Sequence, residues 1–174
     1  MIVSPFCTIG PFFPYEFADN LSDLSKGAQG MPIVIKGHVL EEGGVPTRNS
    51  IVEIWQPDAY GILNHPLDPQ FAQRDPSFRG FGRARTEADG SYSIRTIMPG
   101  ATAERAPHIN VMILAIGLTR RLVTTIFFSD APDPVLNCVP AERRSLLIAC
   151  KEQSGSYRFD FILRGEGETP FFND

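Results

Sequence analysis

The stretch GRARTEADGSYSIRTI, residues 82–97, decides the fold class, because it contains two short predicted strands around a tight turn. Residues 82–87 and 91–97 are the strands, and Asp89-Gly90 between them is a dipeptide typical of two-residue hairpin turns. Short strands joined by such turns are typical of antiparallel sheets. We therefore predict that these residues form a β-hairpin.

Further strands are predicted outside this stretch, each a run of apolar or alternating residues. They are residues 33–40, 50–55, 108–117, 122–128 and 156–163. The first two are expected to pair as a second hairpin around Gly43-Gly44. Residues 140–150 form the one predicted helix, since Pro140 suits a first helical turn. The predicted fold is all-β, with a β-sandwich core of about seven or more strands, long loops and one short helix.

Composition agrees with this fold class. The chain has 174 residues, of which 43% are hydrophobic and 21% charged, and its 15 glycines and 15 prolines are typical of many short strands and turns. Residues 32–174 are predicted to form a single sandwich domain. Residues 1–31 are predicted to be an irregular arm whose aromatic residues pack on a partner chain, or alternatively against this domain.

Charge and hydropathy exclude several classes of partner. The net charge is −4, and the basic residues are scattered except for the pairs at 120–121 and 143–144, so no basic stripe for nucleic acid exists. The apolar first residues lack a positive segment and are interrupted by Pro5, Pro11 and Pro14, which argues against a signal peptide. No run of about 18 apolar residues predicts a membrane span. A cytoplasmic location is expected.

The three cysteines predict no cross-link. Cys7, Cys138 and Cys150 are odd in number, far apart and outside any C-x-x-C pair. Reduced thiols that are buried or half-exposed are therefore expected, rather than a disulfide or a zinc site.

Nucleophile and phosphate-loop motifs are missing from the sequence. There is no G-x-S-x-G, and GEGE at 165–168 is interpreted as a turn, because too few residues follow it to form a helix. Two loops, residues 56–80 and 98–107, are unusually long. Loops of this length in compact domains are usually functional or disordered.

The three histidines offer weak metal sites. His38 lies in a predicted strand and is expected to be exposed or on an edge strand, while His65 lies in the first long loop. His108 begins a buried strand in APHIN, residues 106–110, where side chains at i and i+2 share a face. A His-x-His pair there would offer two imidazoles, but Asn110 takes the second place. His108 is therefore expected to be a hydrogen-bonded core histidine.

Several long motifs, in unbroken order, resemble the intradiol ring-cleaving dioxygenases. They are IVIKGHVLEEGGVP, VEIWQPDAYGIL, FRGFGRARTEADGSYSIRTIMPG, APHINVMIL and SYRFDFILRGEGETPFF. The resemblance runs from about residue 3 to the end of the chain. It implies a β-sandwich and an obligate complex of α and β chains, with one non-haem Fe(III) for each pair.

The resemblance also implies that this chain has lost the iron site. The family's catalytic chain binds iron through two tyrosines and two histidines. The corresponding positions here are Leu63, Thr102, His108 and Asn110. Leucine has no donor atom, and neutral threonine and asparagine are poor ligands for Fe(III). The resemblance thus implies a non-catalytic α subunit, with Fe(III) held by the β subunit and higher αβ oligomers.

Two segments are implied to reach the pocket of the partner chain. The family's α subunit lines the mouth of the β subunit's pocket with a T-x-G-P-[YF] motif, here Thr8, Gly10, Pro11 and Phe12. A family arginine that reaches toward the substrate's carboxylate corresponds to Ile116. Whether Arg120 or Arg121 compensates stays open.

The activity implied is insertion of both atoms of O2 between the hydroxyl-bearing carbons of 3,4-dihydroxybenzoate, giving 3-carboxy-cis,cis-muconate. Ile116 leaves open a catechol with another substituent, such as a sulfonate or a methyl group. Two other functions remain as alternatives. One is a free-standing β-sandwich binding module. The other is an autonomous metalloenzyme that uses His108, His65 and carboxylates such as Asp58 or Asp68.

Overall fold

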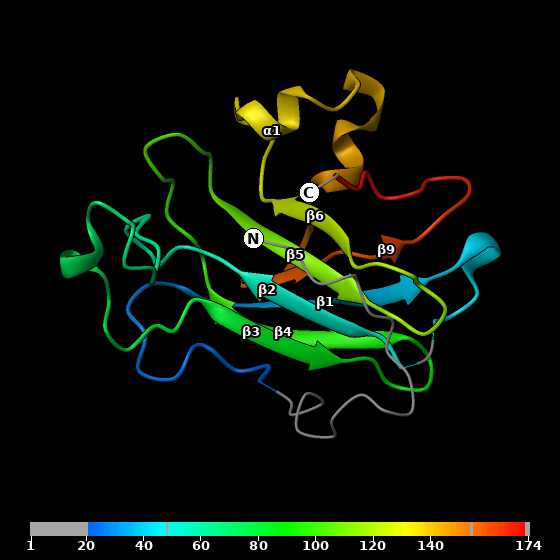
Figure 1. Ribbon diagram of the computed structural model, residues 1–174, viewed down its shortest axis with the longest axis horizontal. Helices are drawn as coiled ribbons and strands as arrows, with labels where there is room; N and C mark the ends of the chain where they lie inside the picture. Colours follow the sequence, from blue (N-terminus) through cyan, green and yellow to red (C-terminus); the bar gives the residue numbers. More distant parts are fainter. Residues whose placement is uncertain (1–20, 48, 154, 173–174) are drawn as a thin grey trace, which may run out of the picture.

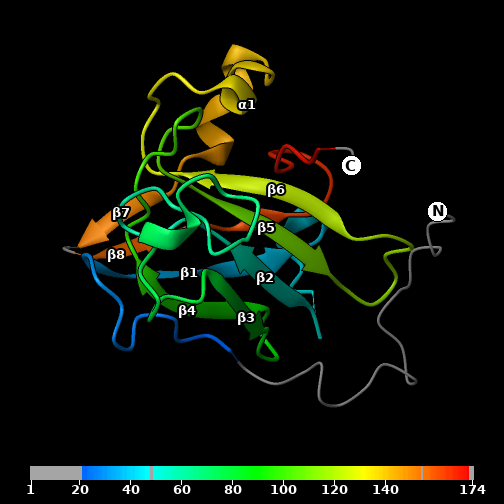
Figure 2. The same cartoon turned by 60° about the vertical axis from the view of Figure 1, so that its left-hand side comes forward.

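The computed structural model describes residues 21–47, 49–153 and 155–172. Two β-sheets are stacked face to face, as Figures 1 and 2 show. The predicted all-β sandwich is confirmed.

The first sheet has the strand order β4-β1-β8-β7. Its strands are β1 (Pro32–Leu40), β4 (Ser91–Ile97), β7 (Cys150–Gln153) and β8 (Ser156–Arg158), and β9 (Phe161–Ile162) also pairs with β1. The β1–β4 and β7–β8 pairs are antiparallel, whereas β8 and β9 run parallel to β1.

The second sheet has the order β3-β2-β5-β6, and all its pairs are antiparallel. Its strands are β2 (Ile51–Trp55), β3 (Phe81–Arg85), β5 (His108–Leu114) and β6 (Leu122–Phe127). This sheet positions the candidate site, because β5 carries His108 and Asn110.

One apolar core lies between the two sheets. Its members come from alternate positions of the strands and include Ile33, Ile35, Val39, Val52, Ile54, Ile94, Ile109, Val111, Ile113 and Ile126. Side chains at the intervening positions point to the outer faces, as the two-residue period of a strand requires. A smaller cluster of Phe127, Leu136, Val139 and Leu147 lies beside β6.

Both predicted hairpins have the wrong strand partners, although their turns form. The amide of Glu87 donates to Ser91 O at 2.9 Å, and the amide of Glu41 donates to Val45 O at 2.7 Å. After each turn, however, the chain crosses to the other sheet. β1 pairs with β4 and β2 with β3. An alternating pattern identifies the buried face of a strand but not its neighbour, and here the paired elements bury their apolar faces by stacking.

The predicted helix at 140–150 is wrong in type and extent. Residues Ala141–Leu147 form a 3₁₀ helix, η4, and β7 begins at Cys150. The amide of Ala149 donates to Phe127 O at 2.8 Å, which draws the chain into extended conformation beside β6. A four-residue α-helix, α1 (Pro134–Asn137), precedes it. Two further 3₁₀ turns are η2 (Glu42–Gly44) and η3 (Phe71–Gln73).

The predicted strand at 156–163 is divided into β8 and β9. The Phe159 amide still donates to Lys36 O of β1 at 2.9 Å, but at Asp160 the side chain replaces the backbone, and its carboxylate accepts the His38 amide at 2.9 Å. His38 lies on a strand that is paired on both sides, so an edge position is wrong, but its side chain is 41% exposed, as the other expectation had it. The turn expected at 165–168 is confirmed, since the Glu168 amide donates to Gly165 O.

Residues just before β1 already contact both sheets. Leu24 is buried in the core. Leu21 forms an antiparallel bridge with Arg83 of β3, and Asp23 a parallel bridge with Arg95 of β4. This segment therefore links the edges of the two sheets, where Figure 1 shows it below β3 and β4.

The described cysteines are more accessible than the sequence predicts. Cys138 and Cys150 are free and exposed, rather than buried or half-exposed, because they lie at the end of α1 and on an edge strand. Cys7 lies outside the described residues. Within the described ranges, no helix has both the length and the hydropathy needed to cross a membrane.

Candidate functional site

The two long loops meet at one end of the second sheet. Asp58 O in the first loop accepts the amide of Gly100 in the second at 2.8 Å. Gly61 lies so close to Ala101 O that a Cβ atom would collide with it, and Gly61 has φ +85°. A glycine is required here for both reasons. This contact brings the loop that carries Leu63 beside the loop that carries Thr102.

Buried aspartates hold the first long loop in place. The Asp58 carboxylate, at 2% exposure, accepts backbone amides from Tyr60, Ile62 and Asp75 at 2.9–3.0 Å. Asp75 is also buried and accepts the amides of Gln29 and Ser77. Their oxygens replace the hydrogen bonds that a regular element would supply to the backbone.

His108 is the buried member of the site. It is 3% exposed, and its Nδ1 lies 2.7 Å from Ala106 O. Burial lowers the pKa of the imidazole against the opposing effect of that backbone contact, and the positive charge of Arg105 lowers it further. His108 is thus buried and has a hydrogen-bond partner, as expected, but it lies on the outer face of the second sheet and not in the core between the sheets.

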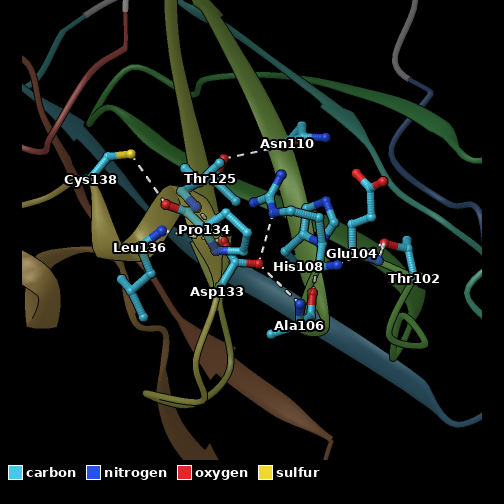
Figure 3. A network of polar contacts seen from close by, with 12 residues as sticks. Thr102, Glu104, Ala106, His108, Asn110, Thr125, Asp133, Pro134, Leu136 and Cys138 are labelled. Carbon is cyan, nitrogen blue, oxygen red and sulfur yellow. Dashed lines mark hydrogen bonds and ion pairs between the residues drawn. The ribbon is translucent and has the colours of Figure 1, made fainter.

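Asn110 is two residues after His108 on β5, so both side chains lie on the outer face of the second sheet. Its Oδ1 accepts the Thr125 hydroxyl at 3.2 Å, across the β5–β6 register that pairs these two residues. Figure 3 shows this pair beside His108. The amide oxygen, the only atom of Asn110 that could bind a cation, is therefore already engaged by a hydroxyl donor.

Thr102 serves its own loop. Its Oγ1 accepts the backbone amides of Arg105 at 3.1 Å and Glu104 at 3.4 Å. Its amide donates to Arg105 O at 3.0 Å. The hydroxyl thus closes a tight turn just before β5.

Leu63 is half-buried in the first loop, and its amide donates to Asp68 Oδ2 at 2.9 Å. Asp68 Oδ1 accepts the amide of Gln70. Both carboxylate oxygens of Asp68 therefore stabilise backbone of the loop.

The residue-based prediction missed the centre of the polar network, which is Asp133. Its carboxylate is completely buried, and Oδ2 accepts Arg105 Nε at 2.7 Å and the amide of Ala106 at 3.0 Å. Oδ1 accepts the amides of Val135 and Leu136 and so caps α1. Figure 3 shows Asp133 between Ala106 and the start of this helix.

Charge stabilises this arrangement. Burial alone would raise the pKa of Asp133, but the hydrogen bonds from Arg105, Leu136 and Val135 outweigh it and hold the pKa below its usual value. Asp133 thereby joins the turn that precedes β5 to the segment that follows β6. The local signal for it was present in the sequence, because Asp followed by Pro at a first helical position is typical of an N-cap.

The four positions that the resemblance compares with iron ligands do not fit Fe(III). Leu63 offers no donor, and the oxygens of Thr102 and Asn110 accept hydrogen bonds from neighbouring groups. Only His108 offers an imidazole, and the nearby Arg105 cation adds to the burial that lowers the pKa of His108. A trivalent cation prefers anionic oxygen and imidazole donors, so these residues form no site for it.

The ligand set of the autonomous metalloenzyme is not brought together either. Among the residues that the structure describes, no three His, Cys, Asp or Glu side chains are grouped as a metal site. His65 is exposed, with Nδ1 accepting the Leu67 amide, and Asp58 is occupied by backbone amides. His38 lies on the first sheet, away from these residues, and its Nδ1 is 3.3 Å from Oδ1 of Asp160.

The residues expected to reach the partner chain are only partly described. Ile116 is 56% exposed in the turn between β5 and β6. Arg120 in the same turn is exposed, and Arg121 is half-buried and has an interaction partner. Thr8, Gly10, Pro11 and Phe12 lie outside the described residues.

Comparison with known proteins gives the family. Residues 16–103, half of the chain, match a family model described as Dioxygenase. The chain is 33% identical to the protocatechuate 3,4-dioxygenase alpha chain of Burkholderia cepacia, over 98% of this chain and 96% of that one. It is 38% identical to the beta chain of the same enzyme and organism, over 85% of this chain and 73% of that one.

Solved structures share the fold. The dioxygenase domain of a carbohydrate-binding fusion protein from Streptomyces sp. SirexAA-E is 26% identical, with a TM-score of 0.62 over 91% of this chain and 96% of that one. An intradiol ring-cleavage dioxygenase from Tetranychus urticae has a TM-score of 0.62 at 20% identity, over 92% of this chain and 93% of that one. These matches and the curated relatives agree with one another, and the chain belongs to the iron-dependent intradiol ring-cleaving dioxygenase family.

Proposed function

We propose that this chain is the non-catalytic α subunit of a heteromeric intradiol dioxygenase that acts on protocatechuate, 3,4-dihydroxybenzoate. In this proposal the β subunit holds the Fe(III), and this chain shapes the mouth of the β subunit's pocket. The donor set at the end of β5 carries the proposal, because Leu63, Thr102 and Asn110 cannot replace tyrosinate and imidazole ligands.

The lengths of the relatives support the α rather than the β assignment. Identity alone does not separate them, since the beta chain of Burkholderia cepacia is the more identical at 38% against 33%. The alpha chain, however, matches nearly end to end, over 98% of this chain and 96% of its own length. The alpha chain of Pseudomonas putida is 36% identical, over 84% of this chain and 78% of its own length.

The reaction consumes one O2 and opens the ring between the two hydroxyl-bearing carbons, so that each carbon becomes a carboxylate of 3-carboxy-cis,cis-muconate. No step of it is assigned to side chains of this subunit. Its contribution is to exclude water and to restrict the shape of the pocket, through Thr8, Gly10, Pro11 and Phe12 of the arm and through Ile116.

Ile116 supports a second candidate substrate. An isoleucine at this place offers no charge to a ring carboxylate, and its exposure leaves it available to an incoming group. A catechol with a sulfonate or a methyl substituent is therefore the alternative within the same reaction. The neighbouring Arg120 is exposed and could supply the cation for an anionic substituent.

The test is iron content and catechol-dependent O2 uptake, for the chain alone and co-expressed with a β-type chain from the same source. We expect almost no iron in the isolated chain, and about one iron per αβ pair with turnover in the complex. Stoichiometric iron and turnover in the chain alone would contradict the proposal. Turnover of 3,4-dihydroxybenzoate against 4-sulfocatechol and 4-methylcatechol then identifies the ring substituent, and Ile116→Arg is expected to shift the preference toward the carboxylate.

A further inference from the structure

Three residues with hydroxyl side chains are buried at one end of the sandwich. Thr47 lies in the connection from β1 to β2, Ser50 directly precedes β2 and Thr86 directly follows β3. These residues are 7%, 0% and 6% exposed. The candidate site lies at the other end of the same sheet, where Trp55 of β2 faces Asn110 of β5. The three hydroxyls therefore belong to a separate part of the molecule.

Thr86 contacts both of the other residues. The Ser50 amide donates to Thr86 Oγ1 at 3.0 Å, and the Thr86 amide donates to Ser50 O at 2.9 Å. Thr86 Oγ1 also lies 3.4 Å from two carbonyl oxygens, those of Thr47 and Ser50. Because one hydroxyl contacts the backbone of both other residues, we call the three residues the hydroxyl cluster.

Two hydroxyls of the cluster have no hydrogen-bond partner among the residues that the structure describes. They are Thr47 Oγ1 and Ser50 Oγ, and both oxygen atoms are buried. Each hydroxyl carries one proton and two lone pairs. Burying such a group without a hydrogen bond is unfavourable, and most buried side-chain polar atoms in folded proteins have a partner in the protein or in ordered water.

The third hydroxyl is poorly bonded as a donor. Hydrogen bonds between a hydroxyl and an oxygen are usually about 2.5–3.0 Å long. Both carbonyl contacts of Thr86 Oγ1 are longer, at 3.4 Å, and its single proton can serve only one of them. Within the described part of the chain, Thr47 O accepts no shorter hydrogen bond. The cluster thus contains more donors and acceptors than its own members can pair.

Hydrogen bonds fix the backbone around the cluster. The Thr47 amide donates to Val39 O at 2.9 Å, and the Val39 amide donates to Gly90 O at 2.9 Å. Arg85 Nη2 donates to Asn49 Oδ1 at 2.8 Å. Asn49 has φ +55°, which asparagine tolerates better than most residues. A small bound molecule can pair the hydroxyls without disturbing these contacts.

We propose that the hydroxyl cluster binds one internal water molecule, which bridges Thr47 Oγ1 and Ser50 Oγ and also donates to Thr86 Oγ1 or Thr47 O. A buried water typically makes about three hydrogen bonds to polar groups that otherwise lack partners, and the cluster offers that number. The members of the cluster are neutral, so they match a neutral molecule with two donors and two acceptors better than a metal cation.

The water joins elements of the chain at the place where it passes between the sheets. β1 belongs to the first sheet, whereas β2 and β3 belong to the second. Thr47 and Ser50 come from the β1–β2 connection and Thr86 from the end of β3. A bridging water therefore adds hydrogen bonds between this connection and β3, beyond those that the protein makes directly.

A high-resolution crystal structure of the full chain tests the site directly. We expect one ordered water within hydrogen-bond distance of Thr47 Oγ1 and Ser50 Oγ. The same position should hold no water in the Thr47→Val, Ser50→Ala double variant. Direct hydrogen bonds from both hydroxyls to protein atoms, with no water between them, would overturn the proposal, and so would a metal ion at this position.

Thermal unfolding of single variants gives a second test, through the sign of the change. If Ser50 Oγ has no partner, Ser50→Ala removes an unpaired buried polar group and raises the midpoint of unfolding. If a water is bound, the same change deprives it of a partner, and we expect the midpoint to fall by at least about 2 °C. Thr47→Val should act in the same direction. A rise in either variant would contradict the water.

The double variant shows whether the two residues share one water. Once the first substitution has weakened the site, the second has less to lose, so the two decreases should add to more than the decrease in the double variant. Strict additivity would refute a shared water. Ser93→Ala, which removes an exposed hydroxyl from β4, is the matched control and should leave the midpoint within about 1 °C of the parent chain.

Discussion

Replacing Asp133 by alanine should be among the most destabilising single changes in this chain. The carboxylate is fully buried and accepts four hydrogen bonds, two from the start of α1 and two from Arg105 and Ala106. Loss of an N-cap costs about 1 kcal/mol. Loss of a buried ionic partner costs roughly 3–5 kcal/mol, which we reduce to about 2–3 because the Arg105 side chain is 20% exposed.

The expected decrease in the free energy of unfolding is therefore about 3–4 kcal/mol for Asp133→Ala. Asp133→Asn keeps an oxygen that can cap α1 but loses the charge that pairs with Arg105, so we expect about half that loss. The exposed Asp130→Ala is the control and should change stability by less than about 0.5 kcal/mol.

Urea unfolding of the full chain, followed by the fluorescence of its single tryptophan, Trp55, measures these differences. A decrease below about 1 kcal/mol for Asp133→Ala, with an unchanged urea dependence, would refute the view that Asp133 joins the loop to α1. An equal loss in Asp133→Asn and Asp133→Ala would show that the charge on this residue is the whole of its contribution and that capping is negligible.

Three further predictions concern pH and backbone geometry. The pKa of Asp133 is lowered in the folded chain. The contribution of Asp133 to stability is therefore present above its unfolded pKa near 3.8 and is lost as pH falls through the folded pKa. The free energy of unfolding, measured as a function of pH in acid, should lack this pH-dependent component in Asp133→Asn. Burial, and then the charge of Asp160, raise the pKa of Tyr92 well above its usual value, while its hydroxyl donates to Phe159 O at 2.7 Å. Stability should consequently fall as pH rises above about 10, less steeply in Tyr92→Phe than in the parent chain, and equal slopes in alkaline melting curves would contradict this. Gly61→Ala should cost more than Gly43→Ala by at least about 2 kcal/mol, because both glycines have positive φ but only Gly61 lies against another backbone; thermal unfolding of the two variants compares them directly.

Much of the candidate site could be identified from the sequence, because it depends on residue chemistry at fixed spacing. The i, i+2 relation of His108 and Asn110 on one strand places both on one face, and the structure confirms this. Asp133 could not be connected with them in advance. It is 28 residues from Arg105, and only the packing of the segment after β6 against the turn before β5 brings the two together.

Local patterns in the sequence determined the fold class and the positions of the turns. Alternation at residues 50–55, the apolar run at residues 108–117 and the turn at Asp89-Gly90 reflect interactions between near neighbours. Strand partners were decided only by tertiary structure. β1 pairs with β4 and not with β2, although the local signals were equally compatible with both, because the pairing must bury the apolar faces of both sheets in one core. The end of the 3₁₀ helix at residue 147 has the same origin, since the bond from the Ala149 amide to Phe127 O of β6 holds the following residues in an extended conformation.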